Sequence, residues 1–403
     1  MEPIDVIVVG AGLAGLRAAQ VLEGAGRSVL VLERAPVVGG RLASRSIDGF
    51  VVDEGFQLVN PAYPELIATG VGDIDLRRFP GVVRYVDANR SLTLPGPHGP
   101  WADARAVARS GDGTWLDLAR VGALTVAAAF SPVGSIRRRR DESTRAALAR
   151  WGVSDAFVGA FIQPFLRGVL LDDELETSWR FTQLLVRSFR GRPGTYPTGV
   201  AALPAALARR LRTATLRVGE AVTAIDASTV TTTSETYRAR RVIVATDATS
   251  AHELVGVAPV RWRAQTTWWY ATPRLADGAV LRLDRRRRFL TSALDVSAVA
   301  PERARPGRSL VAAATNGVAG PADEPGVRDD VARLYDLDLA EVELVTTTPV
   351  ARALVHAPAP LSLSRPSTWG GVVLAGDYLQ TPSIQGALVS GRRAAEAVLA
   401  DFD

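Results

Sequence analysis

Continuous apolar runs and helix-spaced apolar residues alternate at the start of the chain. Residues 5–9 form a short apolar run with the length and continuity of a buried parallel strand. Apolar residues then return at helical spacing until Gly24 and Gly26, at Leu13, Leu16, Ala19 and Leu22. A second apolar run, residues 28–32, predicts another buried strand. The order of strand, helix and strand predicts an α/β fold with a parallel sheet.

The strand pattern returns in the middle and at the end of the chain. Residues 216–225 predict one strand, and a polar hairpin separates it from an apolar run at residues 241–245. Near the C-terminus, residues 371–375 predict a buried strand, and a helix with apolar spacing follows from Pro382 onward. These segments have the character of the first strands, so we expect them to join the same sheet.

Glycines follow the first predicted strand in a pattern that suits a dinucleotide. Gly10 allows a tight turn, Gly12 lets the backbone approach a pyrophosphate, and Gly15 lets the helix pack close to the strand. The start of the helix presents free N–H groups and a partial positive charge to phosphates. Glu33 closes the second predicted strand, where an acidic side chain can accept hydrogen bonds from a ribose. The predicted cofactor-binding residues of this segment are Gly10, Gly12, Leu13, Ala14, Gly15 and Glu33.

A second glycine pair lies close behind the acidic residue. Gly39 and Gly40 precede Arg41, and Arg34 follows Glu33, so this segment offers another backbone cradle and cations for a diphosphate. With these motifs the chain resembles the superfamily of FAD-dependent amine oxidases, phytoene desaturases and protoporphyrinogen oxidases. Members of that superfamily pair the first glycine pattern with a Gly-Gly-Arg segment. The resemblance implies that both segments bind FAD.

The resemblance extends to the C-terminal and middle segments. It implies that Asp377, after the last predicted strand, binds the ribityl or phosphate groups of the flavin. It also implies that a helix N-terminus at Ser383 and Ile384 faces the pyrimidine end of the isoalloxazine. A reduced flavin carries negative charge there, which a helix N-terminus stabilises. Val222 is expected to contact adenine through its backbone.

Element order and resemblance together predict the domain organisation. We expect a Rossmann-like FAD-binding domain made of residues 1–75, 200–255 and 365–403. A discontinuous α+β substrate domain would comprise residues 76–199 and 256–364. The first of these inserts has mainly helical patterns after an initial hairpin, and the second is rich in strand patterns.

The composition excludes several kinds of binding site and covalent link. The chain has 403 residues and no cysteine, which excludes disulfides, thiolate metal sites and a cysteinyl-linked flavin. His98, His252 and His356 form no cluster in the sequence, so we predict no metal site. All 47 basic residues are arginine. The arginine runs at residues 137–140 and 285–288 adjoin acidic residues and lack interleaved aromatic residues, so we expect solvated turns and no nucleic-acid partner.

One apolar segment, residues 116–136, ends at the first arginine run. Pro132 and a few polar residues interrupt it, which argues against a transmembrane helix. We expect a buried helix of the substrate domain, and a weak peripheral contact of an amphipathic helix with anionic lipid is the alternative. Because the first predicted strand begins so early, we expect no signal peptide, and we expect a cytoplasmic protein. The pattern does not indicate the oligomeric state.

The motifs predict an FAD-dependent oxidoreductase in which hydride moves between a substrate carbon and flavin N5. Residues 163–179 and 292–310 look most like bacterial and plastid phytoene-dehydrogenase-like proteins, which implies a small apolar substrate such as a polyene or terpenoid. Tyr270 and Tyr378 are the candidate catalytic residues, because Tyr270 belongs to an aromatic strand and Tyr378 directly follows Asp377.

Several alternatives stay open at this point. A flavin-dependent isomerase would use the same fold and cofactor without net oxidation. An amine oxidase is a further alternative, although many resembling amine oxidases place a lysine beside flavin N5 and this chain has no lysine. A non-enzymatic binder of lipidated proteins would resemble the Rab GDP-dissociation inhibitors. Intact Glu33, Arg41 and Asp377 argue against a chain that has lost its cofactor.

Overall fold

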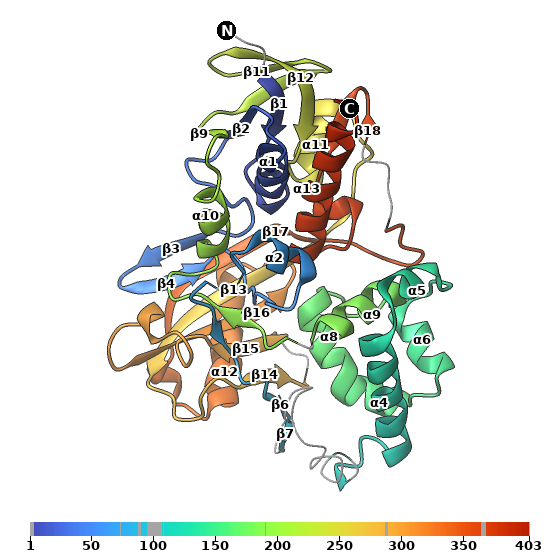
Figure 1. The fold of residues 1–403 in the computed structure, drawn as a ribbon. Coiled ribbons are helices and arrows are strands. Elements are labelled where there is room, and N and C mark those ends of the chain that lie inside the picture. The colour runs from blue at the N-terminus through green and yellow to red at the C-terminus, as the bar shows by residue number, and fades with distance from the viewer. Residues whose placement is uncertain are drawn as a thin grey trace.

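The computed structural model describes residues 4–72, 74–87, 90–94, 107, 109–189, 191–286, 289–363 and 368–402. A sheet with a parallel centre lies at one end of the molecule, together with both chain termini (Figure 1). A largely antiparallel sheet and a group of helices lie at the other end. The predicted α/β class is confirmed. His98 and part of the second arginine run lie outside the described residues.

Continuous apolar strands build the first sheet. Its strands are β1 (Ile4–Val9), β2 (Val29–Glu33), β9 (Thr215–Val218), β10 (Val222–Asp226), β11 (Thr229–Thr232), β12 (Thr236–Val244), β18 (Thr368–Trp369) and β19 (Val372–Leu374). β2, β1, β12 and β19 lie side by side in this order, and all three pairings are parallel. Residues of β2 are buried throughout, as expected for a strand covered on both faces.

Helices cover both faces of this sheet. They are α1 (Leu13–Gly24), α2 (Pro64–Thr69), α10 (Ala202–Ala208), α11 (Ala248–Val255) and α13 (Ile384–Leu399). α1 and α13 lie side by side on one face, far apart as they are in sequence (Figure 1). A Cβ atom at Gly391 would lie 2.1 Å from the carbonyl oxygen of Ala14, so the two helices can approach this closely only with glycine there.

The predicted strand at residues 216–225 is wrong as a single element. β9 ends at Val218, and β10 starts at Val222. Gly219 turns the chain between them with a φ of 73°. β9 pairs in parallel with β2, whereas β10 pairs antiparallel with β11 in the polar hairpin. The apolar pattern alone does not reveal such a turn, because apolar residues lie on both sides of it.

The second sheet is assembled mainly from the insert after residue 256. Its strands are β6 (Val83–Val86), β7 (Ser91–Leu94), β13 (Trp262–Pro273), β14 (Leu281–Asp284), β15 (Ser292–Asp295), β16 (Arg308–Asn316) and β17 (Glu343–Val355). The hairpin predicted from the first insert, β6–β7, joins this sheet through a parallel pairing of β6 with β14. α12 (Glu324–Tyr335) was not predicted; it packs Val327 and Val331 against the sheet. The numbered domain boundaries stay a prediction.

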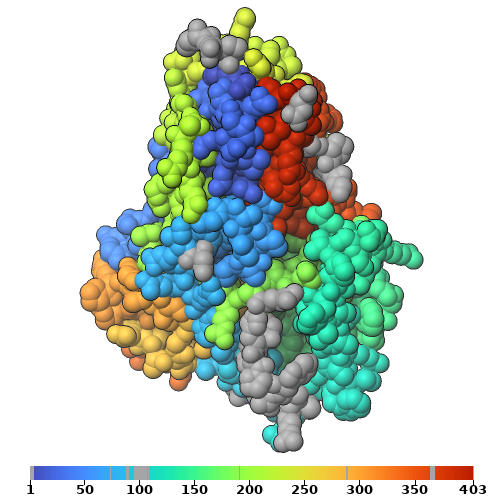
Figure 2. Space-filling model, viewed as in Figure 1, coloured from blue at the N-terminus to red at the C-terminus, as the bar shows by residue number. Residues whose placement is uncertain are grey.

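The first insert folds into a helical group whose apolar core also includes Leu283, Ala357, Leu361 and Leu363 from the second insert. Its helices are α4 (Trp115–Phe130), α5 (Val133–Arg138), α6 (Thr144–Arg150), α7 (Asp155–Phe157), α8 (Gln163–Leu170) and α9 (Trp179–Ser188). Thr114 and Asp117 form a capping box that starts α4, and the helix ends two residues before Pro132. The prediction of a buried helix is wrong for the outer side of α4, which lies on the molecular surface (teal in Figure 2). Among the described helices, none has the length and apolar character that crossing a membrane requires.

A buried ion pair between Arg303 and Asp53 joins the second sheet to a short hairpin that lies between the two large sheets. This hairpin consists of β3 (Ser44–Ile47) and β4 (Phe50–Asp53), and the short strands β5 (Arg77–Arg78) and β8 (Gly194–Thr195) pair nearby. Arg303 is fully buried and donates to Asp53 Oδ2 at 2.9 Å, to Thr195 Oγ1 at 2.8 Å and to the Val51 carbonyl at 3.0 Å. Each of the three guanidinium nitrogens therefore has an acceptor, two of them from β4 and one from β8.

We predict that Arg303→Met lowers the free energy of unfolding by about 3–5 kcal/mol, because it leaves the Asp53 carboxylate buried without its cation. Urea unfolding followed by circular dichroism measures the change. Arg274→Met is the matched control, since Arg274 is exposed, and should shift stability by less than about 0.5 kcal/mol. Equal effects of the two substitutions would contradict the role assigned to Arg303.

Candidate functional site

A cavity of about 970 Å³ lies at the carboxyl ends of the parallel strands in the first sheet. Its lining includes Val9 at the end of β1, Glu33 at the end of β2, Thr246 just after β12 and Asp377 just after β19. Ligands bind in this position in open parallel α/β sheets. On its other side the cavity reaches Gln265 in β13 and neighbouring residues of β17, so both sheets contribute to it.

The first glycine turn is shaped for close approach. Gly10 has a φ of 104°, and a Cβ atom there would lie 2.9 Å from the carbonyl oxygen of Ala245. A Cβ atom at Gly12 would meet nothing within 4 Å, and Gly12 lines the cavity and caps the N-terminus of α1. The open space at Gly12 lets a pyrophosphate approach the helix N-terminus.

Glu33 supports this turn as well as lining the cavity. Its side chain is buried, and Oε2 accepts a hydrogen bond from the Ala11 N–H at 2.7 Å. Oε1 accepts from the Ala35 N–H at 2.9 Å. Because a carboxylate offers about four lone-pair positions, each oxygen keeps acceptor capacity for a ribose hydroxyl. No sequence motif indicates the hydrogen bond to Ala11, which holds the glycine turn to the end of β2.

Arg41 and Asp377 meet across the cavity from opposite ends of the chain. Arg41 Nη2 donates to Asp377 Oδ1 at 2.6 Å, and Nη1 donates to the Ala353 carbonyl at 3.3 Å. Burial alone would lower the pKa of Arg41, but the Asp377 charge and hydrogen bond outweigh burial and raise that pKa. The guanidinium therefore stays charged and remains a cation beside any diphosphate. Gly39 and Gly40 reach this position with φ values of 129° and 58°.

The N-terminus of α13 forms another wall. Ser383 caps the helix by accepting a hydrogen bond from the Gly386 N–H at 3.0 Å. The structure brings almost all the predicted cofactor-binding residues to the cavity, namely Gly10, Gly12, Leu13, Ala14, Glu33, Arg34, Gly39, Gly40, Arg41, Val222, Asp377, Ser383 and Ile384. Gly15 is outside the lining, because it serves packing: a Cβ atom there would lie 1.9 Å from the Gly10 carbonyl oxygen.

The wall opposite the glycine turn is mostly apolar. Its lining residues include Phe56, Gln57, Leu58, Tyr63, Val169, Leu171, Gln265, Pro349, Val350 and Leu354, and the same segments also bring the charged Glu54 and Arg352 to the lining. Gln265 is a buried amide on a strand whose other residues, apart from Arg263, are apolar, aromatic or threonine. The amide in such a strand was the one feature of the sequence that could have pointed to this wall, because a buried polar side chain needs a hydrogen-bond partner.

Neither predicted catalytic tyrosine lines the cavity. Side chains alternate along β13, so Gln265 and Trp269 share one face, and Trp269 Nε1 donates to the Asp53 carbonyl. Tyr270 lies on the other face, packed against α12, with its hydroxyl 3.3 Å from Glu324 Oε1. Tyr378 is buried in the core beside β19, and burial raises the pKa of its hydroxyl above the ordinary value. The arrangement gives no support to a catalytic role for either residue.

A second cavity of about 500 Å³ adjoins the first and shares Tyr63 and Ser383 with it. Its walls come from α2, α5, α9 and the start of α13. Nε of Arg137 and Oε1 of Gln380 are buried without a hydrogen-bond partner in the described part of the chain. The apolar lining residues are Pro64, Ile67, Val133, Phe181, Leu184, Leu185 and Val389.

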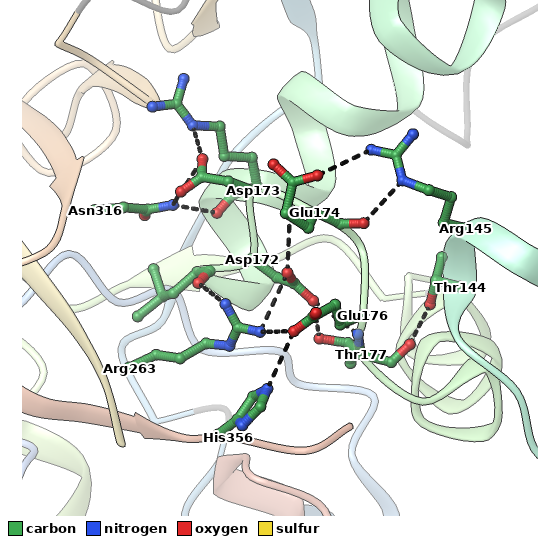
Figure 3. A network of polar contacts seen from close by, with 12 residues as sticks. Thr144, Arg145, Asp172, Asp173, Glu174, Glu176, Thr177, Arg263, Asn316 and His356 are labelled. Atoms are coloured by element: carbon green, nitrogen blue, oxygen red, sulfur yellow. Dashed lines mark hydrogen bonds and ion pairs between the residues drawn. The ribbon is translucent and has the colours of Figure 1, made fainter. Parts of the chain in front are cut away.

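A polar network holds the loop that carries Leu171 into the cavity wall (Figure 3). Arg263, from β13, donates to the Leu171 carbonyl at 2.9 Å and lies 3.2 Å from Asp172 Oδ1. Asp172 Oδ2 in turn accepts from the Thr177 N–H and hydroxyl at 2.7 and 2.6 Å. Leu171 has a φ of 52°, which is uncommon for a side chain of this size. The hydrogen bonds and ion pair of this network hold Leu171 in this conformation and so fix the position of its side chain.

A family model for flavin containing amine oxidoreductases matches residues 13–399. The chain therefore belongs to that family, and FAD is its cofactor. The residues that line the cavity fit this group: open space at Gly12, the N-termini of α1 and α13, and Arg41 between the diphosphate cradle and Asp377. Among the described residues, no group of histidines and carboxylates is arranged to hold a metal ion.

Comparisons with individual proteins agree with this family. Putrescine oxidase of Kocuria rosea is 52% identical over 64 residues, which cover 16% of this chain and 13% of that protein. Phytoene dehydrogenase of Streptomyces griseus is 57% identical over 54 residues, which cover 13% of this chain and 11% of that protein. The matched stretches thus span only a small part of each relative's length.

Solved structures share the fold over the whole chain. An oxidoreductase from Methanosarcina mazei has a TM-score of 0.75 at 16% identity, covering 98% of this chain and 100% of that one. Cyclohexylamine oxidase from Brevibacterium oxydans has a TM-score of 0.68 at 18% identity, covering 99% of each chain. At such low identity the likeness establishes the fold alone.

The polar network leads to a prediction about pH. Burial, then the charges of Arg263 and Arg261, lower the pKa of His356 below its ordinary value of about 6.5. As pH falls below that value, the unfolded chain takes up the proton before the folded one, so stability falls with pH until the folded pKa is reached. We expect His356→Gln to flatten this dependence, measured as the urea midpoint between pH 8 and 5. An unchanged slope in His356→Gln would contradict the assignment.

Proposed function

We propose that this chain is an FAD-dependent oxidoreductase that moves hydride between a carbon of an apolar substrate and flavin N5. One observation carries the proposal: a dinucleotide cradle and a mostly apolar wall face each other within one cavity. FAD, when bound, supplies the hydride chemistry. The protein itself must bind and orient FAD and the substrate and exclude water from the cavity.

Different residues bind the cofactor and the substrate. The N–H groups at the start of α1 and the Arg41 guanidinium bind the diphosphate, and Glu33 accepts from the ribose. The start of α13 at Ser383 places a partial positive charge at the pyrimidine end. On the substrate side, Gln265 supplies an amide among apolar side chains, and it can orient a substrate by one or two hydrogen bonds.

The substrate class is argued from the apolar wall and the second cavity. The wall opposite the glycine turn and most of the second cavity expose hydrocarbon, which suits a long apolar molecule such as a polyene or terpenoid. The chain has no lysine, and arginine, whose guanidinium has a pKa well above that of an amine, does not give up a proton near neutrality. A lysine-assisted oxidation of amines is therefore unavailable to this site.

Amine oxidation is the second candidate. It is favoured by the stretch of 64 residues that is 52% identical to putrescine oxidase of Kocuria rosea. Much of such a short stretch can serve the cofactor, so it does not decide between an amine and a hydrocarbon. The two candidates differ in what reduces the flavin.

We predict that Glu33→Ala and Arg41→Ala each weaken FAD retention by about one to two decades, since each removes a charged hydrogen-bond partner. Gly12→Val should weaken it further, because the new side chain occupies the space for the pyrophosphate. Flavin content after purification and FAD titration of the apoprotein measure the effect. Glu235→Ala, at an exposed carboxylate, is the control. Full flavin occupancy in all three variants would show that the cofactor site is misassigned.

We further predict that monoamines and polyamines, including putrescine, do not bleach the flavin under anaerobic conditions, whereas a polyene in detergent does. Stopped-flow absorbance at the flavin bands measures both. Reoxidation by air should be slow, since no lysine assists the reaction with oxygen. Rapid bleaching by a simple amine, followed by prompt peroxide formation, would replace this proposal with the amine-oxidase candidate.

A further inference from the structure

The outer side of α4 and the start of α5 expose apolar side chains at helical spacing. Trp115 is 73% exposed and Val126 is 52% exposed. Further along, Phe130 is 74% exposed and Val133 is 41% exposed. We call this surface the α4–α5 face, and its residues are Trp115, Leu116, Ala119, Ala123, Val126, Ala127, Phe130 and Val133. In Figure 2 this teal segment lies on the outside of the molecule.

Charged groups of α4 turn away from this face. Asp117 is buried, and its carboxylate accepts hydrogen bonds from the Thr114 and Ser154 N–H groups. Arg120 donates to the carbonyl oxygen of Gly152 on the inner side of the helix. The face therefore presents hydrocarbon where an ordinary surface helix presents polar residues.

Arginines border the face at its α5 end. Arg138 and Arg140 are exposed, and neither makes an ion pair within the residues that the structure describes. The neighbouring acids already have partners: Asp141 accepts from the Ser178 hydroxyl, and Glu142 pairs with Arg150. An uncompensated positive charge thus lies beside an exposed apolar strip, which is the arrangement that anionic lipid attracts.

The size of the face argues against a second copy of the chain as its partner. α4 has 16 residues, which gives a length of about 24 Å and, for a strip one helix wide, an area of roughly 240 Å². A stable protein interface buries about 800 Å² on each partner. A bilayer has no such requirement, because one apolar helix face and a few cations suffice for reversible binding.

We propose that the α4–α5 face docks on an anionic lipid bilayer, with its apolar side chains in the interface and Arg138 and Arg140 against the headgroups. Val133 belongs both to this face and to the lining of the second cavity. Docking therefore places that cavity, and through it the flavin cavity, beside the lipid. The docking itself does not depend on the proposed reaction, and its test needs no substrate.

Co-sedimentation of the FAD-loaded protein with vesicles tests the proposal. The probes are vesicles of phosphatidylcholine alone and vesicles with about one third phosphatidylglycerol, at low salt and at about 1 M NaCl. We expect binding to the anionic vesicles and release at high salt, since salt screens the arginines. The double variant Arg138→Gln/Arg140→Gln should bind about 25-fold more weakly, at about fivefold for each arginine. Trp115→Ser/Val126→Ser should weaken binding roughly tenfold or more.

Matched controls separate this face from the rest of the surface. Val318→Ser changes a valine that is 64% exposed elsewhere, and Arg209→Gln removes an exposed arginine outside the face. Both controls should bind as the unmodified protein does, and flavin content should stay constant in every variant. Equal binding to neutral vesicles, no loss in either double variant, or a dimer in solution that Val126→Ser dissociates would each overturn the proposal.

Discussion

The buried pair of Arg303 and Asp53 is the interaction on which the shape of the flavin cavity depends. A guanidinium that is fully removed from water is costly unless its donors are used, and Arg303 meets two acceptors from β4 and one from β8. Trp269 adds a bond from the second sheet to the Asp53 carbonyl. Residues 54–58 follow immediately and line the cavity. The pair therefore fixes the distance between the cofactor cradle and the opposite wall.

Charge is balanced within the cavity by groups from distant parts of the chain. The carboxylate of Glu33 accepts backbone N–H groups, and that of Asp377 accepts from Arg41. Helices α1 and α13 both begin at the cavity, and each adds a partial positive charge. Gly391 lets these two helices pack side by side, which aims both N-termini at one ligand. A cofactor with a diphosphate at one end and an electron-rich ring at the other meets favourable charge at both places.

Parts of this arrangement could be predicted because their physical cause is local. The glycine turn, the acid at the end of β2 and the Gly-Gly-Arg segment lie within 41 residues, and each conformation depends on neighbours in sequence. The predicted strand at residues 216–225 failed at Gly219, where a single turn redirects the chain. Tyr270 failed for another reason. The pattern of β13 shows that its side chains alternate, but both faces carry aromatic residues, so the pattern does not say which face meets the cavity.

The sequence by itself determined the class of fold and the family, and nearly all of the cofactor-binding residues predicted from it line the cavity, because these depend on short motifs with fixed backbone requirements. The tertiary structure determined which residues form the substrate side of the cavity. Gln265, Leu171 and Val350 come from three elements whose meeting is set by long-range pairs such as Arg303 with Asp53 and Arg263 with Asp172. Tertiary structure also decided that the outer side of α4 stays exposed, since amphipathic spacing fixes which residues share a face, and only packing determines whether another element covers it.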